Sequence, residues 1–123
     1  MQFKSGDRIM QLHVTSDGGC TAGAVDIGLY KSGNAHDGAV IDADLFCSAL
    51  AISSAIARVD EFKQATTLGD GDRGKTLWEL ATVGAASYTT DPMEDWDLVA
   101  TVTTAVTVAV VDLVVEVLYT SGD

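Results

Sequence analysis

The stretch D-W-D-L-V-A-T-V-T-T-A-V-T-V-A-V-V-D-L-V-V-E-V-L-Y, from Asp95 to Tyr119, decides the fold. Valine and threonine fill most of it, and both residue types favour β-strands. Side chains of a strand point alternately to its two faces, and hydrophobic residues recur at every second position in both halves of the stretch. The pattern predicts an antiparallel strand pair, joined as a hairpin by a turn between Thr103 and Thr107.

The same alternation assigns the faces of the two predicted strands. In the first half one face carries Trp96, Leu98, Ala100 and Val102. In the second half one face carries Val111, Leu113, Val115, Val117 and Tyr119, and the nominal outer face carries Val110, Asp112, Val114, Glu116 and Leu118.

A transmembrane helix is the competing interpretation, because the apolar run from Leu98 to Leu118 is about as long as the roughly 20 residues that span a bilayer. Asp112 and Glu116 oppose it, since each acidic residue costs about 2.5 to 3.5 kcal/mol at the centre of a membrane helix. The flanks also lack Lys and Arg. We therefore expect the strand pair to form the core of a soluble β fold.

Length and charge narrow the possibilities further. With 123 residues, 47% of them hydrophobic, the chain is expected to form one domain over residues 1–123 with one core. It has 7 basic and 18 acidic residues and a formal net charge of −11, which opposes binding to nucleic acids and to anionic membranes. The first ten residues contain no apolar run typical of a secretory signal, so we expect synthesis in a cytoplasm. Cys20 and Cys47 lack metal-site spacing and are expected to be buried thiols.

Short strands separated by turn residues occupy most of the remaining chain. In the strand predicted at Arg8–Thr15, Met10, Leu12 and Val14 share one face, and Ile9 lies on the other. Further strands are predicted at Ala24–Tyr30, at 39–41 and at about 55–63, and short helices at 42–50, capped by Asp42, and at 76–81, ended by Gly84. The fold class is therefore mainly β, an antiparallel β-sandwich or jelly roll with one or two short helices.

One segment matches a phosphate-binding pattern. Gly69–Thr76, G-D-G-D-R-G-K-T, fits G-x-x-x-x-G-K-[ST] and precedes a predicted helix. A true phosphate loop follows the first strand of a parallel sheet, whereas the residues after Thr76 predict an antiparallel pair. Asp70 and Asp72 would also place negative charge where anions must bind. A small nucleotide-binding domain using Lys75 and Thr76 is therefore kept only as an alternative.

Other polar residues do not form a recognisable site. His13 and His36 have no predictable nucleophile partner, and helix capping accounts for Asp42 and Asp44. A calcium loop starting at Asp70 would need a glutamate where Ala81 stands. We predict no catalytic residue, no cofactor and no metal, so the chain is not expected to be an enzyme.

Four segments resemble small structural proteins of tailed bacteriophages, namely the capsid decoration or cement proteins. The segments are Thr21–Tyr30 (T-A-G-A-V-D-I-G-L-Y), Asp42–Phe46 (D-A-D-L-F), Lys75–Leu80 (K-T-L-W-E-L) and Trp96–Thr107 (W-D-L-V-A-T-V-T-T-A-V-T). The resemblance implies a jelly roll that forms a homodimer or homotrimer, binds the major capsid protein on the outer surface of the virion and stabilises the head. It implies no catalytic residue.

The residues expected to contact a partner are a stripe on the outer face of the last strand and two aromatic residues. They are Val110, Val114, Leu118, Trp78 and Trp96. The tryptophans are most simply core residues, and an exposed one would suggest an interface anchor. A third hypothesis is a glycan-binding β module of a phage tail, which requires exposed aromatic residues such as Trp78, Trp96 or Tyr88.

Overall fold

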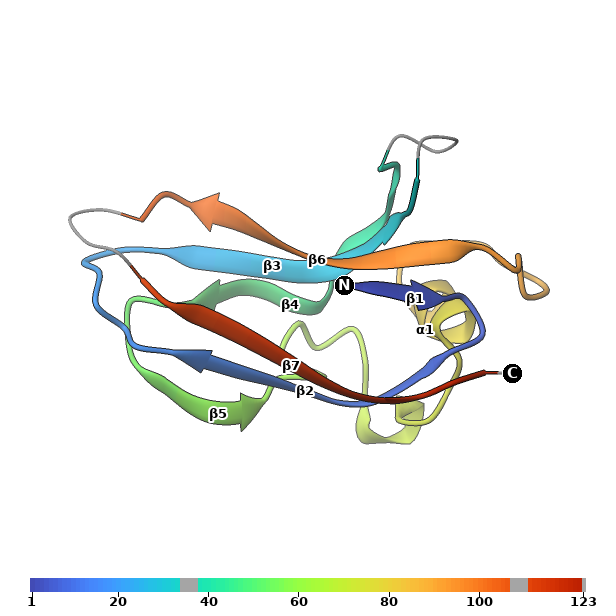
Figure 1. Cartoon of the computed structure of the whole chain (residues 1–123), viewed down its shortest axis with the longest axis horizontal. Coiled ribbons are helices and arrows are strands. Elements are labelled where there is room, and N and C mark those ends of the chain that lie inside the picture. The colour runs from blue at the N-terminus through green and yellow to red at the C-terminus, as the bar shows by residue number, and fades with distance from the viewer. Residues whose placement is uncertain (34–37, 107–110, 123) are drawn as a thin grey trace.

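The computed structural model describes residues 1–33, 38–106 and 111–122 and contains two antiparallel sheets (Figure 1). The first sheet has the order β1-β6-β3-β4 and the second the order β5-β2-β7. The strands are β1 (Gln2–Lys4), β2 (Arg8–Ser16), β3 (Ala24–Lys31), β4 (Val40–Ala51), β5 (Ile56–Asp60), β6 (Asp95–Thr104) and β7 (Leu113–Thr120), with a 3-10 turn at Asp70–Asp72 and one α-helix, α1 (Leu77–Val83). The predicted mainly β fold, consistent with a β-sandwich, is confirmed.

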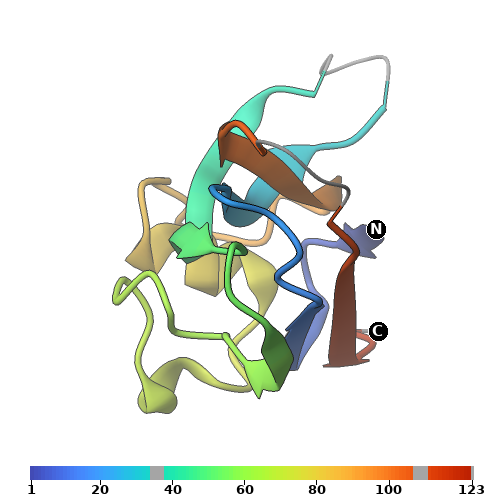
Figure 2. The same ribbon diagram turned by 90° about the vertical axis from the view of Figure 1, so that its left-hand side faces the viewer.

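The core lies between the two sheets. Val25, Ile27 and Leu29 of β3 alternate into it and are at most 1% exposed. On the other sheet Leu12 and Val14 of β2 are fully buried. Figure 2 shows β4 and β5 along one side of the sandwich and β6 and β7 along the other. This arrangement decides which strand edges the fold leaves uncovered.

The predicted hairpin is wrong, although both of its strands form. β6 pairs with β1 and β3, whereas β7 pairs with β2 in the opposite sheet. The two sheets of a sandwich lie about 10 Å apart, and a residue spans at most about 3.6 Å, so the segment 105–112 is long enough to cross between them. Thr103 and Thr104, predicted in the turn, belong to β6, and Thr107 lies outside the described residues.

The helix predicted at 42–50 is also wrong, because these residues belong to β4. The register between β3 and β4 shifts three times, so β4 contains bulges that put extra residues between paired positions. Leu45, Phe46 and Leu50 are buried, which is a spacing that a regular strand does not produce. The apolar pattern departs from a period of two because of the bulges and not because the segment is helical.

A smaller error in the prediction concerns which residues of β2 face the core. Ile9, assigned to the face opposite Leu12, is fully buried, whereas Met10 is only half-buried. The register between β2 and β7 shifts between Ile9 and Gln11, which turns Ile9 toward the core. The strand itself lies where the sequence predicts it.

α1 and β5 lie close to where the sequence predicts them, whereas β1 was not predicted. α1 buries Leu77, Leu80 and Ala81, and Gly84 ends it as predicted. The strand expected at about 55–63 is shorter, Ile56–Asp60. Cys20 and Cys47 are free and buried, as expected. Within the described residues, no helix has the length and apolar character needed to cross a membrane.

Candidate functional site

The predicted contact residues do not form one site. Trp96 is fully buried in the core, so its assignment as a partner contact is wrong. Trp78 is half-buried on α1 and packs against the core. Val114 and Leu118 are 51% and 55% exposed on β7, as predicted. Val110 lies outside the described residues.

The loop that matches the phosphate pattern already uses most of its backbone N–H groups. Leu77 and Trp78, in the first turn of α1, donate to the carbonyl oxygens of Asp7 (2.8 Å) and Ser5 (3.0 Å). The N–H of Gly69 donates to Asp72 Oδ2 at 2.7 Å. A phosphate loop needs such donors directed at the ligand. Here they hold the first turn of α1 to the turn between β1 and β2, and they close the loop on itself.

The side chains of the motif are engaged as well. Lys75 Nζ lies 2.7 Å from Asp72 Oδ1, and the Thr76 hydroxyl donates to Glu79 Oε2 at 2.7 Å. The hydrogen bond from Lys75 lowers the pKa of Asp72, and that from Thr76 lowers the pKa of Glu79. All strand pairs of the two sheets are antiparallel among the described residues. This geometry gives the nucleotide hypothesis no support.

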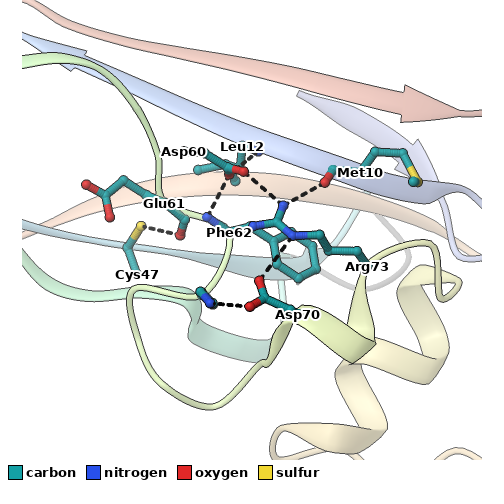
Figure 3. Close-up of polar contacts among 9 residues, drawn as sticks. Met10, Leu12, Cys47, Asp60, Glu61, Phe62, Asp70 and Arg73 are labelled. Atoms are coloured by element: carbon teal, nitrogen blue, oxygen red, sulfur yellow. Dashed lines mark hydrogen bonds and ion pairs between the residues drawn. The ribbon is translucent and has the colours of Figure 1, made fainter.

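Arg73, in the same loop, has a structural role that the sequence analysis did not assign (Figure 3). Its Nη1 donates to the carbonyl oxygen of Met10 at 2.8 Å and lies 2.9 Å from Asp60 Oδ2. Its guanidinium carbon is 4.7 Å from the centre of the Phe62 ring. The other oxygen of Asp60 accepts the N–H groups of Leu12 and Phe62. The sequence feature that could have indicated this role is an arginine within an acidic, glycine-rich segment.

Replacing Arg73 by alanine is expected to lower the free energy of unfolding by about 2 to 4 kcal/mol, because it leaves the partly buried Asp60 without its cation. The pair is about three-quarters buried, with side chains 26% and 25% exposed. The matched control is Arg58→Ala, which removes the exposed ion pair with Glu116 and is expected to cost less than about 1 kcal/mol. Urea unfolding measures both, and equal losses would contradict a clamping role for Arg73.

A hollow of about 480 Å³ lies where the turn after β1, the segment before β6 and the C-terminal end meet. Two of its carboxylates already have partners: Asp7 accepts the N–H groups of Lys4 and Gly122, and Asp91 accepts that of Met93. No aromatic side chain lines it. Nowhere in residues 1–33, 38–106 and 111–122 do three or more His, Cys, Asp or Glu side chains gather as metal ligands. The hollow therefore has neither a glycan platform nor a metal site.

The buried titratable groups are structural. Burial raises the pKa of the Cys47 thiol to about 12, and the nearby Glu61 and Asp26 add to the shift, so the thiol stays protonated. Burial also raises the pKa of Asp42, whose carboxylate accepts the N–H groups of Ala85 (3.0 Å) and Asp44 (3.4 Å). Neither group has the exposure that a nucleophile needs. His36 lies outside the described residues.

The outer face of the second sheet is the remaining candidate surface. β7 is an edge strand, and Val114, Glu116 and Leu118 pair with Thr15, His13 and Gln11 of β2. Two exposed aliphatic side chains therefore flank the ion pair in which Arg58 Nε lies 2.9 Å from Glu116 Oε2. We call these three β7 residues the β7 outer face. It presents two exposed aliphatic side chains on either side of an exposed ion pair.

Comparisons with protein-family models, with curated proteins and with solved structures give no match for this chain.

Proposed function

We propose that this chain is a non-enzymatic structural protein of a phage head, a decoration or cement protein that binds the outer surface of the major capsid protein shell and stabilises it. The proposal rests on the sequence resemblance and on one observation, the exposed β7 outer face with Val114 and Leu118. A cement protein acts by burying such surface against its neighbours and needs no reactive group.

The β7 outer face has the chemistry of a modest interface. Burying apolar surface contributes about 25 cal/mol per Å² removed from water, so the two aliphatic residues favour association. The Arg58–Glu116 pair between them is exposed on both sides, with side chains 62% and 49% accessible, and exposed pairs contribute little in themselves. A partner that covers this face would bury the aliphatic groups around an already neutralised pair.

The test is cosedimentation of the purified protein with phage heads stripped of this component. We expect saturable binding at hundreds of copies per particle, and Val114→Lys is expected to weaken it at least about tenfold, because a charge would have to be buried at the interface. Val40→Lys is the matched control, since Val40 is 62% exposed but lies on β4 of the other sheet. This control should bind like the wild type.

Two results would overturn the proposal. Binding at about a dozen copies would indicate a tail or vertex component, and unchanged binding of Val114→Lys would exclude the β7 outer face. If no head binding occurs, calorimetric titration with nucleotides and with Lys75→Ala tests the nucleotide alternative, and glycan-array binding tests the tail-module alternative.

A further inference from the structure

The second half of β6 has one side without a partner strand among the residues that the structure describes. β1 covers β6 only at Asp95–Asp97. Beyond it Met1 and Leu98 exchange backbone hydrogen bonds, with Leu98 N donating at 2.7 Å and Met1 N at 3.3 Å. From Val99 to Thr104 the strand pairs with β3 alone. We call residues 99–104 the β6 edge.

The inner face of the sandwich is exposed along this edge. Val102 pairs with Val25, yet Val25 is 1% exposed and Val102 is 57% exposed. Ala100, paired with the fully buried Ile27, is exposed as well. Paired residues lie on the same face of a sheet, so Val102 and Ala100 are directed toward the core side without being covered there.

The neighbouring strand of the other sheet shows a weaker form of this feature. Val115 and Val117 of β7 pack against the core but are only half-buried, although their partners on β2, Val14 and Leu12, are fully buried. β6 and β7 lie along the same side of the sandwich (Figure 2). The core is therefore less completely covered on the side where β7 and the second half of β6 lie.

The β6 edge also has few of the features that protect strand edges from pairing. Natural edge strands are shielded by charged residues, proline, bulges or shortness. The other edge strands have such features. β1 is only three residues long, β7 carries the charged Glu116 at its middle, and β5 is made irregular by Arg58, whose φ is +52°. β4 has several register shifts against β3. The β6 edge, V-A-T-V-T-T, has no charge and no proline, and its register against β3 shifts once, beside Thr103.

The distribution of charge indicates what covers this edge. The chain carries a net charge of −11, so two copies repel each other over most of their surface. Leu98–Val111 contains no charged residue. A second copy can therefore approach the β6 edge without placing like charges opposite each other. The small and β-branched residues there are suited to cross-strand pairing with themselves.

We propose that two copies of this chain associate through their β6 edges, which pair antiparallel about a two-fold axis and join the two four-stranded sheets into one. A two-fold contact of this kind uses the same surface on both subunits. Thr101 then faces outward, and Ala100 and Val102 of both copies lie together at the open side of the core. The dimer does not depend on capsid binding, because it uses a different strand from the β7 outer face.

Analytical ultracentrifugation of the full chain tests this directly. We expect the wild type to be a dimer, and Val102→Lys to raise its dissociation constant at least about 100-fold, since two lysines would meet near the axis. Val102→Thr keeps a β-branched, uncharged edge and is expected to remain dimeric. Val114→Lys, the variant directed at the head-binding surface, should also remain dimeric, which separates this proposal from the proposed function.

Amide hydrogen exchange supplies the second readout. In the dimer the amides of the β6 edge are expected to exchange slowly, and Val102→Lys should accelerate those that face away from β3 while β3 itself stays protected. That pattern also shows that the variant is folded. A wild type that is monomeric or trimeric, or a Val102→Lys variant that dimerises like the wild type, would overturn the proposal.

Discussion

Replacing Trp96 by alanine is expected to lower the free energy of unfolding by about 3 to 5 kcal/mol, the range for truncating a large buried aromatic residue. Trp96 is fully buried, and its ring lies 5.5 Å from that of Tyr88. Its indole N–H donates to Glu94 Oε2 at 3.2 Å. The substitution therefore leaves a large cavity and removes a hydrogen bond at the start of β6. A loss of this size is a large part of the stability of a typical small domain.

The matched control is Trp78→Ala. Trp78 is half-buried on α1, so its truncation removes less buried surface and is expected to cost less than the Trp96 variant. Urea denaturation followed by circular dichroism measures both losses without depending on either tryptophan. A Trp96→Ala loss equal to or smaller than that of Trp78→Ala would contradict the role of Trp96 as the main aromatic residue of the core.

Strand patterns were predictable where the backbone is regular. β7 alternates between half-buried and exposed positions along most of its length, so the placement of Val114 and Leu118 together on its outer face followed from the sequence. The inward residues of β3 followed in the same way. α1 was recognisable because Leu77, Leu80 and Ala81 share one helical face, and Gly84 ends the helix. In these elements local spacing and burial agree.

Pairing between strands was not predictable from local spacing. The local sequence of residues 95–119 does not determine that β6 and β7 belong to different sheets, because strand pairing depends on the competing partners β2 and β3. The same limit applies to Val102. Alternation places it correctly on the face shared with Trp96 and Leu98, but exposure depends on whether another element covers that face.

The segment misread as a helix, residues 42–50, depends on one glycine of the neighbouring strand. Leu29 pairs with Asp42, and Ile27 pairs with Cys47. Gly28 alone therefore stands opposite residues 43–46 of β4, which form a large irregular bulge that turns Leu45 and Phe46 into the core. A Cβ on Gly28 would overlap the carbonyl oxygen of Asp42 and the carbonyl group of Ala43. The bulge of β4 can therefore pack against β3 at this position only because β3 has a glycine there.

Gly28→Ala is accordingly expected to destabilise the protein by about 3 kcal/mol or more, at or above the upper end of the usual cost of overpacking, because the obstructing atoms belong to the backbone and cannot rotate away. Chemical denaturation gives the loss, and amide exchange should show that protection falls first along β3 and β4. Gly71→Ala is the matched control, since a Cβ there meets nothing within 4 Å, and it should change stability by less than about 0.5 kcal/mol. If the two variants unfold alike, β4 does not pack over Gly28 as described, and the irregular apolar spacing of residues 42–50 needs another cause.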